Sequence, residues 1–331
     1  MMETIQSTLD MLASQTDQRT SVFDVEVLSI EGSSLTLGGR LFDESQVETL
    51  SRHLPDVKLD TTAVRILRRA GSTRMRVATN LTGLFDKPTI HLPLSSELCY
   101  GAEVEVLEEE DKWAFIRQKD GYLGWVFKAH LADAFASPAT HLVLVPACEL
   151  RSQPDAGSEI LTRVVSGMSV TVEETLGEWA RVAANKTGWI LSSHLRAISD
   201  IPETLEAKRN ALIKDSASMI GIPYVWGGIS GNGIDCSGLT RLLHNWIGID
   251  IPRDADLQYA ASKSVEPPFE VGDLLFFREP GKKRPVTHVG VSLGDWKMIH
   301  SSQANNGVYV DDVQERESLK QMFVSAGSFL R

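Results

Sequence analysis

Hydrophobic and polar residues alternate along two similar segments in the middle of the chain, residues 101–131 and 167–195. Each segment starts with a glycine and alternating valines, continues to Trp113 or Trp179, and closes with Gly-Trp and then His-Leu. Such alternation is typical of half-buried strands, and the glycines mark turns between them. The repeat therefore predicts two small antiparallel β-barrels with tryptophans in their cores.

The N-terminal part of the chain shows a different pattern. Residues 22–42 predict two strands around a glycine turn, residues 43–54 predict a helix, and residues 61–69 predict a third strand. We expect a small ββαβ unit over residues 1–70. No residue in it indicates a chemical function.

Helical spacing of apolar residues dominates after residue 200. A helix that starts near Pro202 is predicted to bury one face, made up of Leu205, Leu212, Ile213 and Ile220. A second helix is predicted from Cys236 onward, with a buried face made up of Leu239, Leu242, Leu243, Trp246 and Ile247. Short strands follow in GDLLFF, THVGVSL, KMIHSS and GVYVDD. Helices first and antiparallel strands later predict an α+β domain over residues 203–331, and hence a multidomain α+β protein.

Composition and charge exclude several classes of protein. The 33 basic and 44 acidic side chains give a net charge of −11, which disfavours binding to nucleic acid or to an anionic membrane. No apolar run is long enough to span a bilayer, and the N-terminus lacks a basic segment followed by an apolar one. The three cysteines are far apart and indicate neither disulfides nor a paired-cysteine metal site. A reducing, cytoplasmic location is expected.

The strongest chemical signal surrounds Cys236. The glycine-rich stretch GGISGNGI cannot continue the helix that follows, so Cys236 is expected at the helix N-terminus, where the helix dipole favours a thiolate. A thiol nucleophile needs a base. His288 and His300 lie on two predicted strands joined by a turn at Gly294-Asp295, which would bring the imidazoles together.

The segments YVWGG, GIDCSGL, IPRDADLQ, VGDLLFF, THVGV and MIHSS follow one another in the order of the NlpC family of papain-like cell-wall cysteine peptidases, which residues 205–315 resemble. The resemblance implies a papain-like fold with Cys236 as the nucleophile and His288 as general base and acid. It implies that His300 orients His288. It also implies that the hydroxyl of Tyr224, with the Cys236 backbone N–H, stabilises the oxyanion.

The two barrels, residues 72–135 and 139–198, resemble bacterial SH3-like domains. Together with the catalytic domain they are similar to γ-D-glutamyl-L-diamino acid endopeptidases of muropeptide recycling. In those enzymes the first SH3-like domain narrows the cleft and helps to recognise a free N-terminal L-Ala. The substrate is then a peptidoglycan stem peptide with meso-diaminopimelate or Lys after D-Glu.

The same resemblance implies a set of substrate contacts: Tyr122 and Asp86 from the first barrel, and Asp235, Ser237 and Ser301 from the catalytic domain. Asp86 stands where the family often has Glu. Asp235 has two open interpretations, because it either binds the free α-amine or caps the Cys236 helix. Arg253 and Asp254 are expected to form a structural ion pair or hydrogen-bond network.

The sequence leaves four alternatives to a peptidase to compare with it. An N-acetylmuramoyl-L-alanine amidase and an acyltransferase would use a similar core, although permuted acyltransferases place the His strand before the Cys. A catalytically idle peptide-binding module would require a broken triad, and Cys236, His288 and His300 are all present. A metal site built from these three residues lacks the usual ligand spacing. No metal and no cofactor are expected.

Overall fold

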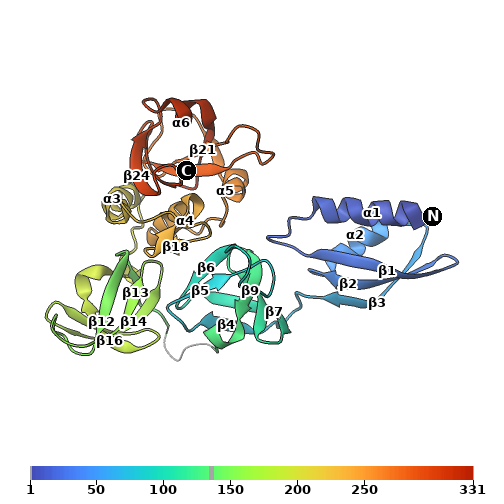
Figure 1. Cartoon of the computed structure of the whole chain (residues 1–331), viewed down its shortest axis with the longest axis horizontal. Coiled ribbons are helices and arrows are strands. Elements are labelled where there is room, and N and C mark those ends of the chain that lie inside the picture. Colours follow the sequence, from blue (N-terminus) through green and yellow to red (C-terminus); the bar gives the residue numbers. More distant parts are fainter. Residues whose placement is uncertain (1, 134–137, 331) are drawn as a thin grey trace.

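The computed structural model describes residues 2–133 and 138–330. Four units follow one another along the chain, and Figure 1 shows two small barrels beneath the C-terminal domain, with the N-terminal unit beyond the first barrel. Within the described residues, no helix combines the length and apolar character needed to cross a bilayer.

The N-terminal unit contains one more helix than the sequence pattern predicted. It consists of α1 (Met2–Gln15), β1 (Phe23–Glu31), β2 (Ser34–Leu41), α2 (Ser45–His53) and β3 (Lys58–Ile66). The sheet has the order β1-β2-β3, with β1 and β2 antiparallel and β2 and β3 parallel. The unpredicted helix α1 buries a stripe at helical spacing, Ile5, Leu9 and Leu12, against the core of this unit.

The two barrels have related strand arrangements. The first contains β4 (Arg74–Val77), β5 (Leu81–Leu84), β6 (Ser96–Cys99), β7 (Glu103–Glu110), β8 (Trp113–Gln118), β9 (Leu123–Phe127) and β10 (Leu131–Ala132). The second contains β11 (His141–Val143), β12 (Ala147–Arg151), β13 (Ile160–Val165), β14 (Ser169–Leu176), β15 (Trp179–Ala183), β16 (Thr187–Leu191) and β17 (Leu195–Ala197). Trp113, Trp125 and Trp189 are buried, as the repeat predicted, whereas Trp179 is only half-buried.

The N-terminal unit packs directly on the first barrel. Phe42 and Leu67 belong to the same buried apolar cluster as Trp113 and Trp125 of the barrel. Beside this cluster, Arg40 and Arg65 both form ion pairs with the nearly buried Glu108 of β7. Shared apolar burial and a shared carboxylate hold the two units together.

The C-terminal domain packs helices on an antiparallel sheet, as predicted. Its helices are α3 (Leu205–Ser216), α4 (Cys236–Trp246), α5 (Ala255–Ala261) and α6 (Glu317–Met322). The sheet has the order β20-β25-β21-β22-β23-β24, made up of β20 (Lys263–Val265), β21 (Leu274–Phe277), β22 (His288–Ser292), β23 (Lys297–Ser302), β24 (Gly307–Asp312) and β25 (Phe323–Ser328). A hairpin of β18 (Ile229–Ser230) and β19 (Gly233–Ile234) precedes α4. The α4 residues predicted to be buried are all buried against this sheet.

The prediction for the buried face of α3 was wrong. Leu212 is buried, but Leu205, Ile213 and Ile220 are exposed. The buried stripe runs instead through Leu212, Asp215, Ser216 and Met219. Asp215 forms an ion pair with Arg196 of the second barrel at 2.7 Å, so polar residues occupy the face that contacts a neighbouring domain. A pattern that counts apolar residues alone cannot identify such a face.

This correction predicts different costs for two neighbouring truncations. Leu212→Ala is expected to lower the free energy of unfolding by about 2–5 kcal/mol, because it leaves a cavity in the core. Ile213→Ala is expected to change it by less than about 0.5 kcal/mol, because that side chain is 47% exposed. Denaturant unfolding of the full chain, followed by tryptophan fluorescence, measures both. Equal losses in the two variants would contradict the observed face.

Candidate active site

The nucleophile candidate lies at the first turn of α4, which begins at Cys236 and is capped by Asp235. The Asp235 carboxylate accepts hydrogen bonds from the backbone N–H groups of Gly238, at 2.7 Å, and Gly227, at 2.9 Å. The glycine-rich loop packs tightly here, because a Cβ on Gly238 would lie 2.3 Å from the carbonyl oxygen of Gly228. The predicted helix start is confirmed, and the cap attaches the loop to it.

The structure brings Cys236 to the strand that carries His288. The backbone N–H of Val289, the residue after His288 in β22, donates a hydrogen bond to the Cys236 sulfur. Cys236 is 9% exposed and His288 is half-buried, so both residues lie at the edge of the core rather than deep inside it.

The two histidines are hydrogen-bonded to each other, with 2.7 Å between His288 Nε2 and His300 Nδ1. Strands β22 and β23 pair Val291 with Ile299, so His300 lies diagonally across from His288, on the same face of the sheet. Gly290 is the residue between them. A Cβ on Gly290 would lie 2.6 Å from the Met298 sulfur and 3.1 Å from the His300 Cβ, so a glycine leaves room for this contact.

A carboxylate that the sequence analysis missed extends this chain. His300 Nε2 lies 3.1 Å from Asp311 Oδ2, and the other Asp311 oxygen accepts from Arg316 at 2.9 Å. A carboxylate can only accept, so His300 donates from Nε2 and accepts at Nδ1. His288 must then donate from Nε2, which leaves its Nδ1 lone pair free to take a proton. The missed signal is the strand pattern of GVYVDD, which places Asp311 on β24 beside His300.

The surroundings favour a neutral thiol beside a neutral imidazole. Burial, and next the Asp235 charge, raise the pKa of Cys236 to about 12, although backbone N–H groups and Arg253 oppose them. Burial, and next His300, lower the pKa of His288 to about 3. Burial and the neighbouring carboxylate therefore oppose the thiolate that the helix N-terminus favours.

Tyr224 lies close enough to Cys236 for the two groups to interact electrostatically. Burial, followed by the charge of Cys236, raises the pKa of the Tyr224 hydroxyl above its usual value. Tyr224 therefore keeps its proton and remains an O–H donor. The oxyanion role that the resemblance implies stays a prediction.

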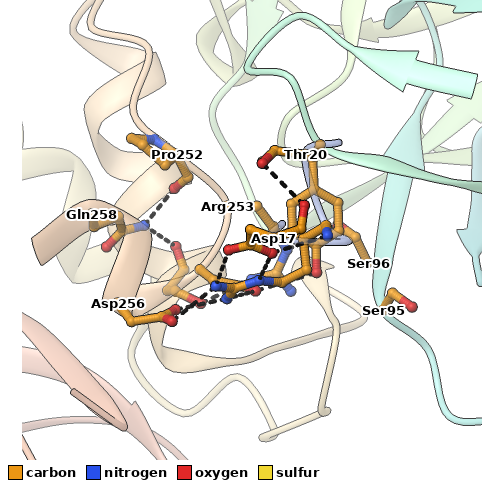
Figure 2. A network of polar contacts seen from close by, with 12 residues as sticks. Asp17, Thr20, Ser95, Ser96, Pro252, Arg253, Asp256 and Gln258 are labelled. Atoms are coloured by element: carbon orange, nitrogen blue, oxygen red, sulfur yellow. Dashed lines mark hydrogen bonds and ion pairs between the residues drawn. The ribbon is translucent and has the colours of Figure 1, made fainter. Parts of the chain in front are cut away.

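Asp235 is held by a buried guanidinium as well as by the helix cap. Arg253, which is 1% exposed, donates to the two Asp235 oxygens at 2.6 and 3.0 Å. It also donates to Ser237 Oγ and, from Nε, to Ser96 Oγ of the first barrel, both at 2.9 Å; Figure 2 shows Ser96 reaching Arg253 from the barrel. The structure thus shows the capping interpretation of Asp235, with the carboxylate neutralised by Arg253.

The other predicted substrate contacts differ in their burial and in their hydrogen bonds to other protein groups. Ser301 is buried and donates to the Ile234 carbonyl at 2.6 Å, so its hydroxyl proton is already used in a bond within the protein. Asp86 is exposed and accepts from Ser95. Tyr122 donates from its hydroxyl to Asp254 Oδ2 at 3.3 Å across the junction of barrel and catalytic domain.

Arg253 and Asp254 are each ion-paired, but with partners other than each other. Arg253 pairs with Asp235, and Asp254 pairs with Arg19 of the N-terminal unit at 2.6 Å. A further, half-buried carboxylate, Glu97, accepts from the backbone N–H of Ile229 at 3.1 Å, and burial raises its pKa. The sequence offered no signal for Arg19 or Glu97, because their partners are distant along the chain. Among the described residues no cluster of histidines, cysteines and carboxylates is arranged to hold a metal.

Comparison with known proteins agrees with this site. Residues 221–326 match the NlpC/P60 family. Residues 84–131 match the bacterial dipeptidyl-peptidase Sh3 domain, and residues 147–196 match the bacterial SH3 domain. The site and these matches define a cysteine peptidase. The chain carries an NlpC/P60 domain, and two bacterial SH3 domains precede that domain. Residues 1–83 lie outside all three matched ranges.

Several known proteins are similar to this chain over most of its length. A gamma-D-glutamyl-L-lysine dipeptidyl-peptidase of Bacillus cereus is 28% identical over 66% of this chain and 70% of its own length. Dipeptidyl-peptidase 6 of Lysinibacillus sphaericus is 28% identical over 72% of this chain and 91% of its own. The crystal structure of an NlpC/P60 family protein from Bacillus cereus has a TM-score of 0.68 at 23% identity, over 78% of this chain and all of that one. That last likeness establishes the shared fold.

The contact between His300 and Asp311 predicts a loss of activity in Asp311→Asn. The Asn side chain can present either a donor or an acceptor to His300, so it no longer fixes which nitrogens of the two histidines carry protons. We expect kcat to fall at least about 10-fold with little change in KM. Asp312→Asn is the matched control, because Asp312 follows directly on β24 and its carboxylate accepts only from the backbone N–H of Gln314 in the described contacts. Similar kinetics for the two variants would contradict the proposed relay.

The lowered pKa of His288 predicts the pH dependence. The imidazole acts as a base only when neutral, and a pKa below the usual 6.5 keeps it neutral in weak acid. The acid limb of kcat/KM is therefore expected below pH 6.5, with activity retained at pH 6. Steady-state rates over a pH series measure this limb. A limb at or above pH 6.5 would show that burial does not lower the His288 pKa.

Proposed function

We propose that the protein hydrolyses the bond between γ-D-Glu and the diamino acid, meso-diaminopimelate or Lys, in peptidoglycan stem peptides with a free N-terminal L-Ala. One observation carries this proposal. The first barrel presents the Tyr122 hydroxyl to Asp254 of the catalytic domain, next to the Arg253–Asp235 pair that adjoins Cys236. A barrel residue at this point limits how many residues the substrate can have on the N-terminal side of the bond that is cut. The names of the relatives from Bacillus cereus and Lysinibacillus sphaericus support a dipeptidyl-peptidase.

The catalytic steps follow from the hydrogen bonds of the site. His288 Nδ1 takes the thiol proton as the Cys236 sulfur attacks the γ-carbonyl carbon of D-Glu. The backbone N–H of Cys236 and the Tyr224 hydroxyl donate to the oxyanion. His300 and Asp311 hold and stabilise the imidazolium, which returns its proton to the leaving amine of the diamino acid. Water then hydrolyses the thioester with His288 as base, which releases L-Ala-D-Glu.

The substrate ammonium is assigned to the junction of Tyr122 and Asp254. Asp235 is less suited to bind it, because Arg253 and two backbone N–H groups already occupy its oxygens. Asp254 Oδ2 accepts from Tyr122 and Arg19, and among the described residues no hydrogen bond reaches Oδ1. Asp86 adds negative charge within electrostatic range of Tyr122. Ser237, beside the nucleophile, contacts the dipeptide portion.

The chemistry of the substrate indicates the place of the reaction. An L-Ala amine becomes free only after the amide that joins the stem peptide to the sugar has been hydrolysed. An enzyme that requires this amine therefore acts on released fragments, and we place it in cell-wall recycling in the cytoplasm. The net charge of −11 agrees with a small-peptide substrate rather than a polyanionic surface.

Hydrolysis of synthetic L-Ala-γ-D-Glu-meso-diaminopimelate, followed by mass spectrometry, tests the proposal. We expect release of L-Ala-D-Glu, little cleavage of an N-acetylated copy, and loss of at least about 10³-fold activity in Cys236→Ala. A copy with Lys in third position measures the preference for the diamino acid. Equal cleavage of the acetylated peptide would remove the amine requirement. Cleavage only at the sugar-linked amide of intact muropeptides would make the enzyme an amidase.

A further inference from the structure

Arg19 of the N-terminal unit reaches the substrate end of the site and uses every donor it has. Its Nε and Nη2 donate to Asp17 at 3.0 and 2.7 Å. Nη1 and Nη2 donate to the two oxygens of Asp256 at 2.7 and 2.9 Å, and Nη1 also donates to Asp254 Oδ2 at 2.6 Å. A guanidinium has five N–H groups, so Arg19 has none left for a ligand. Figure 2 shows the carboxylates of Asp17 and Asp256 converging in this network.

The main chain at Arg19 is held as firmly as the side chain. The Arg19 carbonyl accepts from the backbone N–H of Leu123, the residue after Tyr122, at 2.7 Å. The segment turns just there, with Thr20 and Ser21 donating to the Asp17 carbonyl at 3.0 and 2.9 Å. One residue therefore contacts both sides of the junction, the barrel beside Tyr122 and the catalytic domain at Asp254.

The charge of this cluster still favours a cation. Three carboxylates surround a single guanidinium, and Asp254 and Asp256 are mostly buried at the start of α5. The cluster keeps a net negative charge in a partly dehydrated position, where it attracts an ammonium more strongly than in water. A bidentate guanidinium also fixes the orientation of the carboxylates that it binds.

We propose that Arg19 is a positioning residue for substrate recognition: it holds Asp254 so that Oδ1 and the Tyr122 hydroxyl face the terminal ammonium of the peptide. The N-terminal unit is then a part of the substrate-binding site and not an appendage. The inference rests on the proposed function for the identity of the peptide. Its specific content is that residues outside the three matched domains determine the preference for a free amine.

The test compares Arg19→Met and Arg19→Lys with Arg40→Met in the full chain. Arg40 is a matched control, because it belongs to the same unit and also bridges carboxylates, Asp24 and Glu108, away from the site. When Arg40 is replaced, Arg65 still pairs with Glu108 and the apolar cluster still joins the unit to the barrel. For the free-amine peptide, Arg19→Met is expected to raise KM about 10-fold with kcat within about 2-fold, and Arg19→Lys to restore part of the loss. Rates for the N-acetylated peptide, and all rates of Arg40→Met, are expected to stay unchanged.

Two kinetic results would overturn the inference while leaving the peptidase in place. Equal losses of kcat/KM for the free and acetylated peptides would show that Arg19 only stabilises the fold. A gain of activity on the free-amine peptide would show that its guanidinium occupies the ammonium position and blocks it.

Calorimetric binding to the Cys236→Ala protein separates this inference from the proposed cleavage. We expect the free-amine tripeptide to bind at least about 10-fold more tightly than the acetylated one, and Arg19→Met to abolish that difference. This result would support the inference even if the wild type cut a different bond. Equal binding of the two peptides would overturn it, whatever bond the wild type cuts.

Discussion

The structure of the site depends on neutralising a buried carboxylate next to the nucleophile. Asp235 caps α4 and holds the glycine-rich loop, but its charge is costly away from water. Arg253 compensates for it with two hydrogen bonds and has its own Nε bound by Ser96 of the first barrel. Loss of one partner from such a buried pair costs about 3–5 kcal/mol of stability. The Asp235–Arg253 pair therefore couples the positions of the start of α4, the glycine-rich loop and the first barrel.

The same compact packing sets the chemistry of the thiol. Burial opposes the charged forms of both Cys236 and His288, so the proposed mechanism moves the proton from thiol to imidazole as the sulfur attacks. The chain of His288, His300 and Asp311 has one consistent arrangement of donors, which leaves a basic nitrogen on His288. His300 is neutral in this arrangement, and the negative charge next to it comes from Asp311.

The first barrel and the N-terminal unit both contact the catalytic domain near Asp235 and Asp254. The first barrel contributes Tyr122 and Ser96, and the N-terminal unit contributes Arg19, whereas the second barrel is joined to the catalytic domain on another side through Arg196 and Asp215. The N-terminal unit is fixed to the first barrel by a shared apolar cluster around Trp113. In the proposed function, recognition of the peptide terminus is therefore a property of several domains together.

The sequence by itself determined the barrels and the α4 helix and named the candidate catalytic groups, because each depends on local periodicity, a helix start or a short ordered motif. The sequence also predicted that His288 and His300 lie close together, because a hairpin turn joins their strands. It missed α1, although the spacing of Ile5, Leu9 and Leu12 carries that information, and it misassigned the buried face of α3. Only the tertiary structure paired Arg253 with Asp235, Arg19 with Asp254 and His300 with Asp311. These contacts join charged residues from different elements, and the free energy of a charge depends on its surroundings in space, which no local pattern of residues contains.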